Sequence, residues 1–109
     1  MTDSLSNVLQ PIETANGLPN NHYTCQDTYN EERKALFFDQ WSGLAVASDV
    51  PINGDAKPID FAGVPLLLMR GSDDVVRVFQ NTCRHRGMIL VEEPRNIEGA
   101  IRCPYHSWC

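Results

Sequence analysis

Apolar and polar residues follow each other in short runs over the second half of the chain, a pattern typical of β-strands separated by turns. Strand candidates and short apolar segments lie at 43–47, 59–61, 65–70, 75–79, 88–91 and 100–101. Turn-forming residues separate them at Asn53-Gly54, Ala62-Gly63 and Gly71-Ser-Asp-Asp, and residues 93–96 are loop material. The pattern predicts a mainly β fold, an antiparallel β-sandwich or open barrel.

A short helix is predicted ahead of the strands. Thr28 and Glu31 have the spacing of a capping box. A polar run is then followed by apolar residues at 35–38 and by Trp41. We expect a helix over about residues 29–40.

Residues 1–27 show no period and are rich in Asn, Ser, Thr and Pro. They predict an irregular arm, with a turn at Leu18-Pro19-Asn20. Since 109 residues suit one small domain, we divide the chain into this arm and a domain over 28–109.

The net charge of −5 argues against a general nucleic-acid binder. Six of the nine basic residues are arginines within 70–109. Either these arginines are distributed by chance, or they lie near an anionic group. The start of the chain lacks the features of a secretory signal. The longest mainly apolar stretch, 61–69, is too short to span a bilayer, so we expect a soluble, cytoplasmic protein without a membrane partner.

Two of the four cysteines stand close to histidines. Cys83-x-His85 is followed, after 17 residues, by Cys103-x-x-His106. An even cysteine count allows disulfides, but a reducing cytosol disfavours them. The pairing of cysteine with histidine therefore indicates metal ligation.

Two kinds of metal centre fit this set of ligands. A [2Fe–2S] cluster takes two side chains per iron, and histidines can replace two thiolates on one iron. Gly87 and Pro104 suit the tight loops that would carry each pair. Two cysteines and two histidines also suit tetrahedral zinc, although the one-residue gap in the first pair is unusual there. A zinc-stabilised, non-catalytic binding module is therefore the alternative.

The sequences Cys83-Arg-His-Arg-Gly and Cys103-Pro-Tyr-His-Ser-Trp resemble the two cluster-binding loops of Rieske non-haem iron oxygenases. These are the catalytic subunits of aromatic-ring-hydroxylating dioxygenases and of related monooxygenases acting on quaternary amines. Residues 29–41 are similar to the helix before that domain, and 64–81 to the strands leading to the first loop. The resemblance implies a Rieske-type β-sandwich with a short N-terminal helix over 28–109, incomplete at the C-terminus.

The resemblance also implies roles for the four ligands. Cys83 and Cys103 would bind one iron, and His85 and His106 the other. The cluster would pass single electrons to a mononuclear iron for O2-dependent hydroxylation or demethylation. A ferredoxin or flavin reductase would supply electrons, and a catalytic domain of the same or a neighbouring subunit would receive them through His106. The mononuclear iron site belongs to a later domain, so this chain alone is not expected to be the complete enzyme.

Respiratory Rieske proteins differ by an extra cysteine in each loop, where this chain has Met88 and Tyr105. Trp108 stands where their second loop offers a serine hydroxyl. We therefore expect no disulfide across the cluster and a potential at the low end of the Rieske range, about −150 mV. Arg86 and Trp108 would flank the cluster without binding it.

A stand-alone Rieske ferredoxin is a further alternative. It is less similar, because only three residues follow the last ligand here. Cys25 and Cys109 match no ligand position. We expect Cys25 to be an incidental thiol and Cys109 to be structural.

Overall fold

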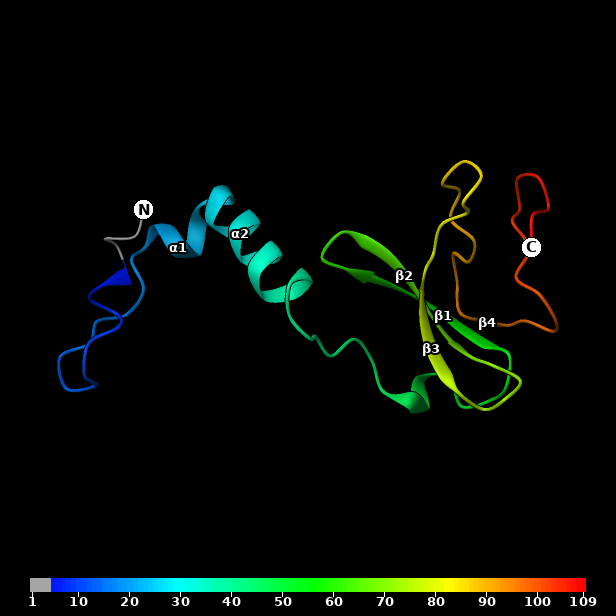
Figure 1. Cartoon of the computed structure of the whole chain (residues 1–109), viewed down its shortest axis with the longest axis horizontal. Coiled ribbons are helices and arrows are strands. Elements are labelled where there is room, and N and C mark those ends of the chain that lie inside the picture. The colour runs from blue at the N-terminus through cyan, green and yellow to red at the C-terminus, as the bar shows by residue number, and fades with distance from the viewer. Residues whose placement is uncertain (1–4) are drawn as a thin grey trace. The chain divides into compact units, whose positions relative to one another are not determined.

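The structure, a computed structural model, describes residues 5–109. They fall into two compact units with a boundary between Ser42 and Gly43. The helical segment over residues 21–38 lies in the N-terminal unit, and the C-terminal unit contains the sheet (Figure 1). Within the described part of the chain, no helix is long and apolar enough to cross a membrane.

The predicted helix is present but begins earlier. Helix α2 spans Gln26–Glu32 and continues as a π-helical segment over Arg33–Phe38. Cys25, in extended conformation, is the N-cap residue. The predicted capping box is wrong, because Thr28 and Glu31 lie inside the helix and cannot cap it.

A further helix, α1, spans Asn21–Thr24 within the segment that we expected to be irregular. It follows the predicted turn at Leu18-Pro19-Asn20, where the His22 N–H donates to the Pro19 carbonyl at 2.9 Å. Period analysis misses a helix of four residues because it completes little more than one turn. Residues 1–4 of the arm lie outside the described residues.

The sheet of the C-terminal unit has four antiparallel strands in the order β3-β2-β1-β4. They are β1 (Asp55–Phe61), β2 (Val64–Arg70), β3 (Val76–Gln80) and β4 (Arg95–Asn96). The mainly antiparallel β fold is therefore confirmed, and both hairpins stand where the sequence placed them.

The hairpin from β1 to β2 turns on Ala62 and Gly63. Both have positive φ, 50° and 84°, as in the two-residue turns whose twist matches that of the strands. The Asp60 carboxylate accepts the Gly63 N–H at 3.0 Å. This turn pairs Phe61 with Val64 and sets the register of both strands.

The strand predicted at 43–47 is wrong. That segment has no partner strand, and it leads into a 3₁₀ turn over Ala47–Asp49. The Arg70 side chain holds the 3₁₀ turn that follows: its Nε donates to the Val50 carbonyl at 2.6 Å and a terminal nitrogen to the Ala47 carbonyl at 3.0 Å. The guanidinium thus satisfies two backbone carbonyls that have no strand partner.

Strand β4 was not predicted, because residues 93–96 were expected to form a loop. Asn96 pairs with Asp55 in the β1 ladder, and its side-chain amide donates to the Asp55 carboxylate at 2.8 Å. Two residues carry no detectable alternation, so this strand has no sequence signal.

The core of this unit is small and joins the sheet to the segments around the Cys-His pairs. Ala56, Leu67 and Val91 are buried together. Partly buried side chains that pack on them are Met69, Leu90, Ile97 and Ile101. Because Val91 follows the first Cys-His pair and Ile101 precedes the second, burial of this core fixes where both loops leave the sheet.

The turn between β2 and β3 holds an ion pair that makes stability depend on pH. Arg77 donates to both carboxylate oxygens of Asp73, at 2.9 and 2.7 Å. This pair, with the Val75 N–H, lowers the pKa of Asp73 to about 2. Folding lowers this pKa, so the stabilisation is fully present above about pH 4 and is lost as the pH falls toward 2.

In an Arg77→Gln variant we expect the pKa of Asp73 to rise toward its usual value of about 3.9, measured by NMR titration of the carboxyl carbon. The acid loss of stability should then begin at higher pH. The control is Arg84→Gln, which removes the same charge in the loop after Cys83. An unchanged Asp73 pKa in Arg77→Gln would contradict the assignment.

Candidate metal centre

The first Cys-His pair lies on a tight loop, loop 1 (residues 83–88). The Thr82–Ile89 bridge closes its base. Inside it the Cys83 N–H donates to the Met88 carbonyl, and the Gly87 N–H donates to the Cys83 carbonyl, both at 2.8 Å. Gly87 has φ of 71°, a conformation in which glycine carries no steric penalty.

The second pair lies on loop 2 (residues 103–108), which repeats this backbone. The Cys103 N–H donates to the Trp108 carbonyl at 2.7 Å, and the Ser107 N–H to the Cys103 carbonyl at 3.0 Å. Ser107 has φ of 60°, matching Gly87 of loop 1. The sequence hides this likeness, because the histidine stands two residues after the cysteine in loop 1 and three after it in loop 2.

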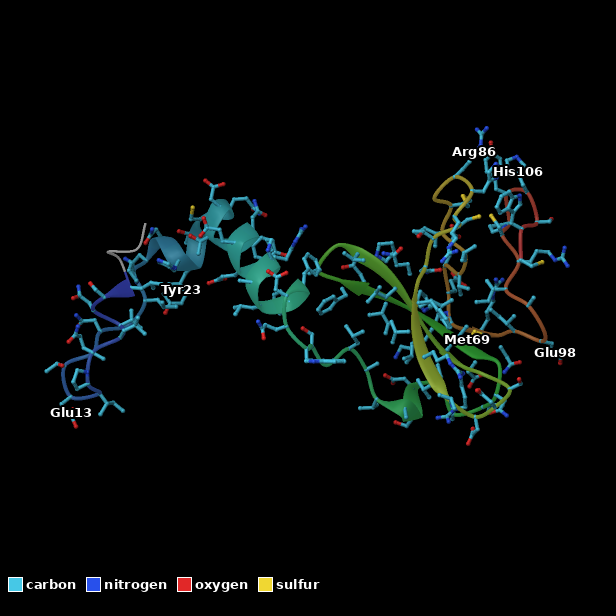
Figure 2. All side chains as sticks on the ribbon, in the orientation of Figure 1. Glu13, Tyr23, Met69, Arg86, Glu98 and His106 are labelled. Carbon is cyan, nitrogen blue, oxygen red and sulfur yellow. The ribbon has the colours of Figure 1, made fainter. Side chains whose placement is uncertain are left out.

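The two loops bring all four predicted ligands together. Cys83 and Cys103 are buried, with 9% and 3% exposure, and the Cys83 thiol is close enough to Cys103 to lower the pKa of its thiol. The rings of His85 and His106 are exposed, with centroids 5.0 Å apart. Figure 2 shows Arg86 and His106 at the tips of the two loops, at the same end of the unit.

Backbone amides near the Cys103 sulfur lower the pKa of its thiol. The N–H of Tyr105 lowers the pKa of the Cys103 thiol, and the N–H of His106 and the thiol of Cys83 act in the same direction. Burial opposes them. The net lowering favours the thiolate, which is the form that binds metal.

The donor set fits a [2Fe–2S] cluster with mixed ligands. Two soft sulfur donors lie together on the buried side, and two imidazoles lie together on the exposed side. This is one pair of ligands for each iron of a Rieske cluster. Tetrahedral zinc would instead draw all four donors onto one ion. The separation of the donors into a sulfur pair and an imidazole pair therefore favours the cluster over zinc.

The arginines of this half of the chain have different surroundings. Arg84 and Arg86 are exposed in the turn of loop 1. Arg70 and Arg77 instead form ion pairs with aspartates of the β2–β3 turn. The excess of arginine is thus partly a feature of the site and partly a feature of the sheet.

The remaining two cysteines, Cys25 and Cys109, are not among the predicted ligands. All four cysteines are free in the structure. Cys25 is the N-cap residue of α2, in the N-terminal unit. Cys109 is exposed, and its thiol contacts the Ser107 carbonyl at 3.6 Å.

Asn81 supports loop 1, and sequence reasoning missed it. Its side chain is buried, with 2% exposure. It donates to the Val91 carbonyl at 2.7 Å and accepts the Val91 N–H at 3.0 Å. The side-chain amide thus pairs with the Val91 backbone at the base of loop 1, as a neighbouring strand would. An asparagine just before a Cys-His pair resembles any other turn residue, so the sequence offers no signal for this role.

We expect Asn81→Ala to lower the free energy of unfolding by about 1–3 kcal/mol, because it leaves two buried backbone groups unsatisfied. Urea unfolding followed by circular dichroism measures the change. Asn53→Ala is the matched control, since that exposed side chain makes one long hydrogen bond of 3.5 Å. Equal unfolding midpoints for the two variants would contradict the role of Asn81.

Known proteins are similar in sequence to this chain over most of its length. Residues 40–109 match the family model of the Rieske [2Fe-2S] domain. The chain is 33% identical to the 2-aminobenzenesulfonate 2,3-dioxygenase subunit alpha of Alcaligenes sp, over 99% of this chain and 28% of that protein. It is also 33% identical to the carnitine monooxygenase oxygenase subunit of Escherichia coli K12, over 84% of this chain and 24% of that protein.

Solved structures show the same fold. The apo form of a quaternary ammonium Rieske monooxygenase superposes with a TM-score of 0.79 at 32% identity, over 84% of this chain and 27% of that one. A Rhodococcus naphthalene 1,2-dioxygenase gives 0.68 at 32% identity, over 75% and 19%. The chain spans about a quarter of the length of the curated relatives it matches. By its family match, its fold and its relatives, the chain belongs to the Rieske [2Fe-2S] domain family, in the form found in Rieske oxygenase subunits.

Proposed function

We propose that this chain binds a [2Fe–2S] cluster and passes single electrons to a mononuclear non-haem iron in a catalytic domain. Cys83 and Cys103 would hold one iron, and His85 and His106 the other. The observation that carries the proposal is the separation of the two donor types. The thiols meet in the buried interior of the loops, and the imidazoles meet at the exposed tips.

Each part of the site has a task in electron transfer. A bound cluster supplies a one-electron carrier, and its two imidazole ligands raise its potential above that of all-cysteine clusters. The N–H groups of Tyr105 and His106 donate to the Cys103 sulfur and disperse its negative charge. Burial of both sulfurs keeps water from them. The exposed rings of His85 and His106 would be the ligands that a partner protein reaches first.

The electron acceptor would be a catalytic domain of the same or a neighbouring subunit, reached through His106. The relatives are oxygenase subunits, and inter-subunit electron transfer is described for one quaternary ammonium Rieske monooxygenase. The donor would be a ferredoxin or a flavin reductase. The exposed Arg84 and Arg86 favour a donor with an acidic docking face, because opposite charges speed encounter. O2-dependent hydroxylation or demethylation would follow at the mononuclear iron.

Anaerobic reconstitution of the chain with iron and sulfide, followed by EPR of the reduced protein, tests the proposal. We expect a Rieske-type signal, two irons per chain and a midpoint potential near the low end of the Rieske range, about −150 mV. Stoichiometric zinc binding without any Rieske signal would overturn the proposal. A strongly positive midpoint would retain the cluster but contradict the oxygenase type.

A further inference from the structure

Trp108 contacts a candidate ligand that lies on the other loop. Its indole, from loop 2, stacks on the imidazole of His85 in loop 1, with ring centroids 4.6 Å apart and planes within 3°. Parallel stacking at this distance is a favourable aromatic geometry. Trp108 thereby links the second loop to a ligand of the first.

The backbone of Trp108 is tied to a ligand of its own loop. Its carbonyl accepts the N–H of Cys103 at 2.7 Å. The preceding residue, Ser107, has a positive φ of 60°, which turns the chain back toward Cys103. Trp108 therefore has one anchor at a sulfur ligand and one at an imidazole ligand.

The imidazole of His85 is not packed in the protein interior, so its orientation depends on neighbouring surface side chains. The residue is exposed at the tip of loop 1. The ring of His106 meets it edge-on, at 5.0 Å and 61°, a contact that leaves the plane of His85 free to tilt. The face-to-face stack with Trp108 fixes that plane. No disulfide ties the loops, since all four cysteines are free.

We propose that Trp108 is a positioning residue for His85. Its indole holds the imidazole in the plane in which a ring nitrogen faces the iron, and it clasps the two loops together. The inference rests on the proposed function, since His85 must be a ligand for its orientation to matter.

The test uses the full chain loaded with iron and sulfide, in four forms besides wild type. Trp108→Ala removes the stack, Trp108→Phe retains an aromatic face, and Trp108→Leu retains apolar bulk without one. Trp41→Ala is the matched control, because that tryptophan is fully exposed in the N-terminal unit. The readouts are the rate of iron loss to a chelator and the nitrogen hyperfine couplings of the reduced cluster, measured by pulsed EPR.

We expect Trp108→Ala to lose iron about two- to tenfold faster, the factor that corresponds to one aromatic pair. One of the two nitrogen couplings should broaden, because His85 then samples several tilts. Trp108→Phe should restore both readouts, and Trp108→Leu should resemble Trp108→Ala.

Two results overturn the inference while the proposed function stands. In one, wild type shows the Rieske signal and Trp108→Ala behaves like Trp41→Ala. In the other, Trp108→Leu restores both readouts as fully as Trp108→Phe, which would make bulk rather than stacking responsible. A wild-type chain without a Rieske signal overturns the proposed function and, with it, the inference.

Discussion

Cys83→Ala is expected to abolish the Rieske EPR signal and to reduce bound iron and sulfide to background. A [2Fe–2S] cluster needs two side-chain ligands on each iron, besides the bridging sulfides. The alanine would leave one iron with a single side-chain ligand. Cys103→Ala should have the same effect, because the two thiols meet at one buried position. Metal analysis, visible absorption and EPR of the reconstituted chain measure the loss.

The chain supplies its own controls for this experiment. Cys25→Ala and Cys109→Ala remove the same thiol group elsewhere, one at the N-cap of α2 and one at an exposed position after loop 2. Both variants should keep wild-type iron, sulfide and signal. Loss of the signal in Cys109→Ala, with the signal retained in Cys103→Ala, would show that the wrong cysteine has been assigned to the cluster.

Leu67→Ala is expected to lower the free energy of unfolding by about 2–5 kcal/mol, because it opens a cavity at the centre of the core. Leu67 is fully buried and packs with Ala56 and Val91. A small domain has little stability to lose, since few residues bury its core. A substantial unfolded fraction is therefore expected at room temperature.

Urea unfolding of the reconstituted chain measures this change, with cluster occupancy held constant because bound metal adds stability of its own. The control is Ile52→Ala, where the side chain is 65% exposed. Its unfolding midpoint should stay close to that of wild type. Equal destabilisation by the two variants would contradict the placement of Leu67 at the centre of the core.

The sequence identified the features that rest on local chemistry. Ala62-Gly63 marked the first hairpin because it stands between two apolar runs, and Gly71-Ser-Asp-Asp marked the second. The four candidate ligands stood out because cysteine and histidine at such spacing are rare outside metal sites. The structure places the two cysteines in the interior of their loops and the two histidine rings side by side, and their role as ligands stays a prediction.

Features that depend on distant partners were not predictable. The segment at 43–47 has the composition of a strand, but it pairs with no strand and ends at a 3₁₀ turn whose flanking carbonyls accept from the Arg70 side chain. β4 exists because Asn96 meets Asp55, far away along the chain. The role of Asn81 needs the position of Val91, and no local pattern records that. Ser107 adopts a conformation that favours glycine because the loop backbone around Cys103 requires it.

The meeting of Cys83 and Cys103 also has a consequence for the unfolded chain. A cluster held by both would close a ring of about 20 residues, and within that ring lies Val91, a member of the core. By the chain-entropy argument used for disulfides, such a cross-link disfavours the unfolded ensemble by about 3 kcal/mol. The supply of iron and sulfide would then set the folded fraction of the protein as well as its capacity to carry electrons.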